Sequence, residues 1–149
     1  MKKKQEEPAI EITKNFVKEK FKEYNELYFN GILPSCKCHI FKSNNFFGRY
    51  TYSQTKKSNV GHIWIAYNVD WHEDDLREII IHEMIHHYVQ MIEGHKGGLL
   101  GHNWRFKRQC KRMKKEYGIA IHILYPHLYH IGQKKPTNLF QKIRRFLGF

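Results

Sequence analysis

The segment 73–93 limits the possible folds more than any other part of the 149-residue sequence. Its apolar residues recur at the helical period and predict one long helix with a broad apolar face. Asp70, followed by Glu73 three residues later, predicts a capped start, and Gly94 predicts the end. The residues of the apolar face are Leu76, Ile79, Ile80, Met84, Val89 and Ile92. Such a helix packs against other elements of a folded domain.

Two further helices are predicted on either side of this segment. Apolar residues at helical spacing occur in 10–29, which ends at Asn30 and Gly31. A similar stripe occurs in 103–117, which ends at Gly118. Residues 10–117 are therefore predicted to contain three helices.

Short runs of β-branched and aromatic residues predict that sheet. The predicted strands are 38–41, 48–53 and 63–67, and the polar residues 54–59 are predicted to be a loop. Residues 119–125 are interpreted as a strand or an extended segment, and 137–149 as a short basic amphipathic helix. The pattern as a whole predicts an α+β fold.

The composition is typical of one folded domain. Hydrophobic residues make up 41% and aromatic residues 15%, which excludes a disordered chain. Three cysteines cannot form a disulfide framework, and no apolar run reaches the ~18 residues of a membrane span. Polar residues follow the basic N-terminus, so we expect a cytoplasmic protein rather than a secreted one. We expect a flexible basic N-terminus (1–9), one domain (10–132) and a basic amphipathic tail (133–149).

His82 and His86 lie four residues apart inside the predicted long helix, with Glu83 next to the first. Four residues advance a helix by about 400°, so the two imidazoles stand about 40° apart on neighbouring turns. Both can reach one ion at the ~2.0–2.1 Å that zinc prefers. The Glu83 carboxylate can take a proton from water that the ion activates. The spacing therefore predicts a metal site with an adjacent general base.

A catalytic zinc ion takes three protein ligands and keeps one position open, so a third ligand is required. His87 points about 100° away on the helix, and Glu93 lies two turns too far along it. His102 follows a glycine at the start of the next predicted helix, where a turn can bring it over the metal, and it is the favoured ligand. His95, in the glycine-rich loop 94–101, and Glu116 remain alternatives.

Four stretches of the sequence together form a pattern that is similar to a known family. They are 80–88 (IIHEMIHHY), 101–106 (GHNWRF), 25–34 (NELYFNGILP) and 48–50 (GRY). This pattern resembles the SprT-like metalloproteases, the group that includes Spartan. The resemblance extends over residues 10–125.

The resemblance implies a zincin-like single domain. Its parts would be an N-terminal helix, a small three-stranded sheet, an active-site helix with the HExxH motif and a following helix that carries the third ligand. It implies His82, His86 and His102 as ligands of one Zn²⁺ per chain and Glu83 as catalytic base. The implied activity is the hydrolysis of peptide bonds in proteins that are bound to or crosslinked on DNA.

Positive charge is concentrated in the last third of the chain. Residues 1–104 contain 14 basic and 13 acidic residues, whereas residues 105–149 contain 12 basic residues and one acid. Such a segment attracts polyanions, and it would contact DNA without the cysteine-rich zinc ribbon that many relatives carry. The predicted nucleic-acid residues are Arg105, Lys107, Arg108, Lys111, Arg112, Lys114, Lys115, Lys134, Lys135, Lys142, Arg144 and Arg145. Association with the nucleoid is a further expectation.

A second interpretation is a non-catalytic basic nucleic-acid-binding module with a structural or vestigial metal site. One of the later histidines would then occupy the fourth coordination position and exclude the reactive water. Those histidines are His122, His127 and His130. The tail at 137–149 could also dock on a membrane surface or in the groove of a partner.

Overall fold

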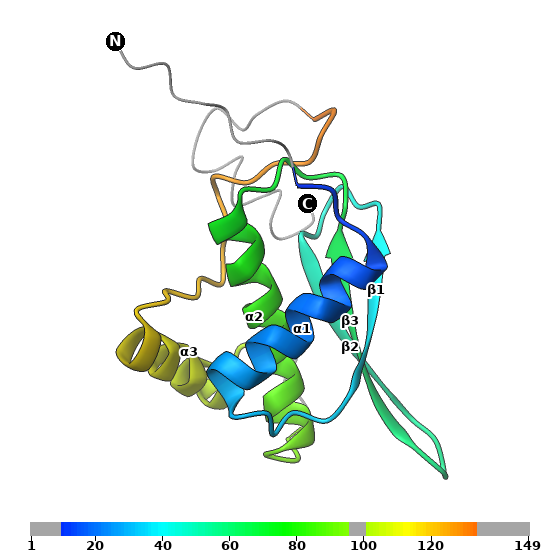
Figure 1. Ribbon diagram of the computed structural model, residues 1–149, viewed down its shortest axis with the longest axis vertical. Helices are drawn as coiled ribbons and strands as arrows, with labels where there is room; N and C mark the ends of the chain where they lie inside the picture. The colour runs from blue at the N-terminus through cyan, green and yellow to red at the C-terminus, as the bar shows by residue number, and fades with distance from the viewer. Residues whose placement is uncertain (1–9, 96–100, 134–149) are drawn as a thin grey trace.

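The computed structural model describes residues 10–95 and 101–133 and has an α+β architecture (Figure 1). The helices are α1 (Lys14–Phe29), α2 (Glu73–Met91) and α3 (Trp104–Tyr117). The strands are β1 (Cys36–Phe41), β2 (Gly48–Gln54) and β3 (Asn59–Ala66), in the sheet order β1-β3-β2. The central strand β3 runs parallel to β1 and antiparallel to β2. This confirms the predicted α+β class, its helices and its three-stranded sheet.

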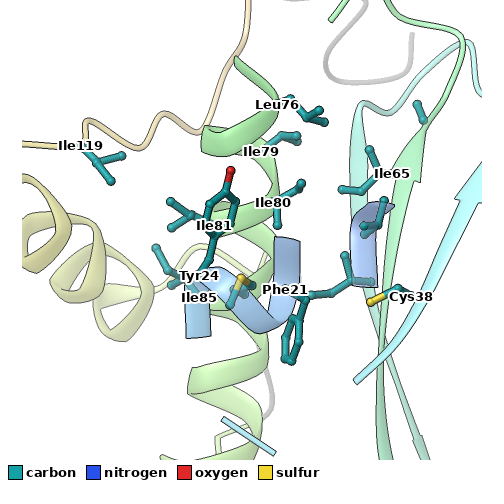
Figure 2. Close-up of a cluster of buried hydrophobic side chains, with 14 of the residues drawn as sticks. Phe21, Tyr24, Cys38, Ile65, Leu76, Ile79, Ile80, Ile81, Ile85 and Ile119 are labelled. Atoms are coloured by element: carbon teal, nitrogen blue, oxygen red, sulfur yellow. The ribbon is translucent and has the colours of Figure 1, made fainter. Parts of the chain in front are cut away.

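Helix α2 is the centre of the molecule. It runs between α3 and the sheet, and α1 crosses in front of it (Figure 1). Figure 2 shows isoleucines of α2 in one cluster with Phe21 and Tyr24 of α1 and Ile65 of β3. The burial extends beyond the predicted face to Ile81 and Ile85, because α2 has neighbours on most of its circumference. Only the end of the predicted face is wrong, since Ile92 lies past the last turn and is 42% exposed.

Helix α1 begins four residues later than predicted because Thr13 caps it. The Thr13 hydroxyl accepts a hydrogen bond from the Phe16 amide at 3.1 Å, and the preceding residues are not helical. The predicted end at Asn30 is confirmed, since this residue adopts the left-handed conformation with φ 53°. The side chain of Asn25 then pairs with both backbone groups of Leu33 at 3.1 Å and directs the chain into β1.

Strand β3 begins earlier than predicted, and the polar loop is correspondingly shorter. Residues 59–62, part of them expected in the loop, pair with β2 through the register Gln54↔Asn59 to Thr51↔His62. The turn occupies 55–58, where the Thr55 hydroxyl accepts hydrogen bonds from the amides of Lys57 and Ser58 at 3.3 and 3.0 Å. Gln54 and Asn59 were predicted to lie in the loop because they are polar. Polar residues also occur on the solvent-exposed face of a pair of antiparallel strands, as in β2 and β3 here.

One further prediction is wrong, and another holds only in its second alternative, an extended segment packed on the core. Helix α2 is preceded by His72 as its N-cap, without a side-chain capping bond, so Asp70 does not cap it. Residues 119–125 form no strand, and within 119–133 the only sheet-like pairing is an isolated bridge between Val69 and His130. This irregular segment runs along α2 (Figure 1). The predicted helix at 137–149 lies outside the described residues.

Candidate metal centre

The structure brings His82, His86 and His102 together. The first two lie on successive turns of α2, and His102 precedes α3. One nitrogen of each ring lies within 4.8 Å of the other two, and the Nε2 atoms of His82 and His102 are 3.0 Å apart. Three nitrogens at this separation can hold one metal ion.

Gly101 allows His102 to reach this position. The backbone of Gly101 has φ +65°, a conformation that residues with a side chain rarely adopt. A Cβ atom at this position would also lie 3.0 Å from Cε1 of His86. Asn103 then starts α3 at once, since its side chain accepts hydrogen bonds from the amides of Arg105 and Phe106. The chain therefore turns sharply over α2 and presents the third imidazole to the first two.

Phe106 forms the apolar floor under the three imidazoles. Its ring centroid lies 4.8 Å from His82, 4.5 Å from His86 and 4.7 Å from His102. The side chain has no exposed surface, so it restricts the orientations of all three rings. Phe106 belongs to the predicted helix 103–117 and to the motif 101–106, and neither pattern assigns it this second role.

The three imidazoles are neutral near physiological pH. Burial lowers the pKa of His82 well below its usual value, and the neighbouring histidines lower it further. Burial and His102 together lower the pKa of His86 to about 3. The pKa of His102 is also lowered, by burial and then by Lys107. Neutral imidazole is the form that binds metal, so this donor set fits a borderline-soft divalent ion such as zinc.

The backbone carbonyl of His122 determines which ring nitrogen of His82 faces the other two histidines. Its Nδ1 lies 2.9 Å from the carbonyl oxygen of His122, which can only accept a hydrogen bond. Nδ1 therefore carries the proton, and the Nε2 lone pair is directed toward His102. The Tyr125 hydroxyl lies 3.1 Å from the same Nδ1.

Glu83 is buried next to the histidine cluster. The residue is 4% exposed, and burial raises the pKa of its carboxyl to about 8. A Cβ atom on Gly48 of β2 would lie only 2.7 Å from its Oε1, so glycine is needed for β2 to approach this closely. The absence of a side chain at position 48 thus leaves room for the Glu83 carboxylate under the strand.

The cluster opens into a cleft of about 820 Å³. One wall is β2, from Gly48 to Tyr52, and the opposite wall is the irregular segment at 123–125. Strand β2 is an edge strand that pairs with β3 alone among the described residues. The cleft therefore offers an unpaired strand edge beside the three histidines and Glu83.

His87 holds β2 against α2 and takes no part in the cluster. Its Nε2 donates a hydrogen bond to the carbonyl oxygen of Pro34 at 2.9 Å, and its Nδ1 accepts one from the Tyr50 hydroxyl at 3.1 Å. A Cβ atom on Gly61 would lie 2.3 Å from Nδ1 of His87, so β3 also packs directly on this ring. The expectation that His87 points away from the ion agrees with this geometry.

The other candidates for the third ligand lie elsewhere in the structure. His95 lines the cleft but does not belong to the cluster. Glu116 forms an ion pair with Arg112 at 3.1 Å, and Glu93 forms ion pairs with Arg105 and Arg108. The later histidines also have other contacts: His122 with Glu78, His127 with Asp75 and His130 with the carbonyl of Phe46.

The predicted nucleic-acid residues on α3 differ in whether they form ion pairs with acidic residues of the chain. Arg105, Arg108 and Arg112 form ion pairs with acidic residues of the chain itself. Lys111, Lys114 and Lys115 are exposed and belong to none of the ion pairs between described residues. Lys107 is exposed near His102. Lys134, Lys135, Lys142, Arg144 and Arg145 lie outside the described residues.

Comparison with known proteins identifies the family. The model of the SprT-like family matches residues 17–127, which is most of the chain. The chain therefore belongs to the SprT-like family, as the sequence motifs predicted. No curated protein matches the chain. Among the described helices, none is both long and apolar enough to cross a membrane.

Proposed function

We propose that this protein is a zinc-dependent metalloprotease with a zincin-like active site. The observation that supports this most directly is the group of three neutral imidazoles next to the buried carboxyl of Glu83. His82, His86 and His102 would hold the zinc ion, and all three line the cleft together with Glu83. A bound zinc ion supplies Lewis-acid chemistry, in which water becomes nucleophilic near neutral pH and a peptide carbonyl is polarised.

In this proposal Glu83 is the general base. Its side chain lines the same cleft as the three histidines, so its carboxylate would lie close to an ion that they hold. Glu83 takes a proton from the attacking water and returns it to the amine of the departing peptide. Burial raises the pKa of this carboxyl to about 8 in the metal-free chain, and the charge of a bound divalent ion would lower it and favour the carboxylate that a general base needs.

The substrate would be an extended stretch of protein. The free edge of β2 can align such a segment by main-chain hydrogen bonds, from Gly48 toward Tyr52. The exposed lysines of α3 support a substrate that is bound to or crosslinked on DNA, since they add positive charge on the same helix that follows His102.

The metal site is tested by measuring zinc per chain with elemental mass spectrometry. We expect one zinc ion in the wild type and little in His102→Ala, because two imidazoles alone bind zinc weakly. His95→Ala and Glu116→Gln are matched controls that should retain the metal, since these residues lie outside the cluster. Full zinc content in His102→Ala would contradict the three-histidine site. A wild type without zinc would favour the non-catalytic basic module instead.

Binding to DNA is tested by replacing the three exposed lysines of α3. The variant Lys111→Gln, Lys114→Gln, Lys115→Gln should bind duplex DNA more weakly than the wild type. The slope of log K against log salt should become shallower by about 0.9 for each phosphate that the variant no longer neutralises. The matched control replaces three exposed lysines of α1, namely Lys14, Lys18 and Lys22. Equal weakening in the two variants would indicate nonspecific attraction by net charge rather than a binding face on α3.

A further inference from the structure

We propose that Glu78 is a positioning residue, which orients the imidazole of His82 for metal binding through the segment 122–125. This inference rests on the proposed metal site. Glu78 lies on α2 one turn before His82, and its side chain is only 13% exposed. It is absent from the HExxH motif, and its hydrogen bonds go to His122 rather than to the three imidazoles. Its influence on the site must therefore pass through the residues that it holds.

Glu78 holds His122 by two contacts with one oxygen. The backbone amide of His122 donates a hydrogen bond to Oε1 of Glu78 at 2.7 Å, and the Nδ1 atom of its ring lies at the same distance. Residue 122 has no regular secondary structure to fix its backbone. Glu78 thus determines where the carbonyl of residue 122 lies, and this carbonyl accepts the hydrogen bond from His82 Nδ1 at 2.9 Å.

Glu78 also lies near the second oxygen that contacts His82. The Tyr125 hydroxyl lies 3.1 Å from His82 Nδ1, and burial together with the nearby carboxylate of Glu78 raises its pKa, so the hydroxyl stays protonated. The carboxylate of Glu78 therefore anchors the residue that carries the first oxygen within reach of Nδ1 and lies near the second oxygen. Groups of this kind fix the tautomer of a ligating histidine, and their loss typically weakens metal affinity about 10–100-fold.

Asp75 offers a matched control on the same helix. It lies three residues before Glu78 and contacts His127 of the same irregular segment, with its Oδ1 2.8 Å from Nε2 of the ring. This pair also attaches the segment to α2, but it makes no contact with an oxygen that reaches His82. A comparison of the two positions therefore separates the orientation of His82 from the general attachment of the segment.

The experiment compares Glu78→Ala with Asp75→Ala in two measurements. The first is zinc affinity, determined by competition of Zn²⁺ with a chromogenic chelator. We expect Glu78→Ala to bind zinc about 10–100-fold more weakly and Asp75→Ala to bind it as the wild type does. Glu78→Gln retains an oxygen that can accept from the His122 amide, so it should recover most of the affinity. This conservative variant also covers the case in which Glu78→Ala fails to fold.

The second measurement is the tautomer of His82 in the metal-free protein, from long-range proton–nitrogen correlation spectra. The wild type and Asp75→Ala should show the Nδ1–H form, and Glu78→Ala a mixture of both tautomers. Equal zinc affinity and the same tautomer in all variants would overturn the proposed role of Glu78 and leave the proposed metal site unaffected. Equal weakening by Asp75→Ala would also overturn it, since attachment of the segment would then suffice. Absence of zinc from the wild type would overturn the metal site itself.

Discussion

Glu83→Gln should retain the metal and lose the hydrolysis of peptide bonds, with kcat about 10²–10⁴-fold lower than in the wild type. Glutamine has nearly the same shape, so the packing under Gly48 should survive. The amide cannot accept and return a proton, and general acid–base catalysis would be lost. The measurement is cleavage of a quenched fluorescent peptide, with zinc content determined on the same samples.

The control for this variant is Glu19→Gln, the same chemical change at an exposed position of α1. It should leave both cleavage and zinc content unchanged. Undiminished cleavage by Glu83→Gln would contradict the role of Glu83 as general base. Loss of zinc together with activity would mean that Glu83 supports the metal site rather than the proton transfer.

The same substitution should stabilise the metal-free protein, by up to about 3 kcal/mol at pH 7. The pKa of Glu83 is raised from 4.5 to about 8 in the folded chain. A carboxyl with a raised pKa contributes its full stability below pH 4.5 and loses it as the pH rises toward 8. Glutamine carries no ionisable proton. The difference in the free energy of unfolding between Glu83→Gln and the wild type should therefore be smallest at pH 4.5 and increase up to about pH 8.

Urea denaturation of chelator-treated protein at pH 5 and pH 7 measures this difference. Comparison of the two proteins at each pH cancels the contribution of the buried histidines, which both proteins share. Glu19→Gln should change the free energy of unfolding little at either pH. A destabilised Glu83→Gln variant at pH 7 would show that the buried carboxyl makes a favourable contact that outweighs the cost of its burial.

Local signals in the sequence predicted most of the helices and much of the site. Asn30 ends α1 and Asn103 starts α3 by interactions within a few residues, so their effects can be inferred from neighbours in the sequence. The spacing of His82 and His86 places both rings on one side of α2 because helix geometry alone determines their separation. Family membership followed from the same short stretches.

Interactions between residues that lie far apart in the sequence were predicted poorly or not at all. Residues 59–62 pair with β2 because the register with 51–54 is satisfied, and the polarity of Asn59 did not indicate this. His95 and Glu116 remained alternatives to His102 until the turn at Gly101 and the ion pair of Glu116 were known. The hydrogen bond of Glu78 with His122 spans 44 residues and has no motif.

The sequence by itself determined the α+β class, the family and the pair of histidines with Glu83, since helical periodicity, capping and i,i+4 spacing are local properties of the chain. Only the tertiary structure decided which third histidine joins them, how β2 approaches Glu83 and how Glu78 reaches His82. These arrangements depend on where irregular segments cross α2. Their positions follow from burial and hydrogen bonding between residues far apart in the chain, which no short pattern encodes.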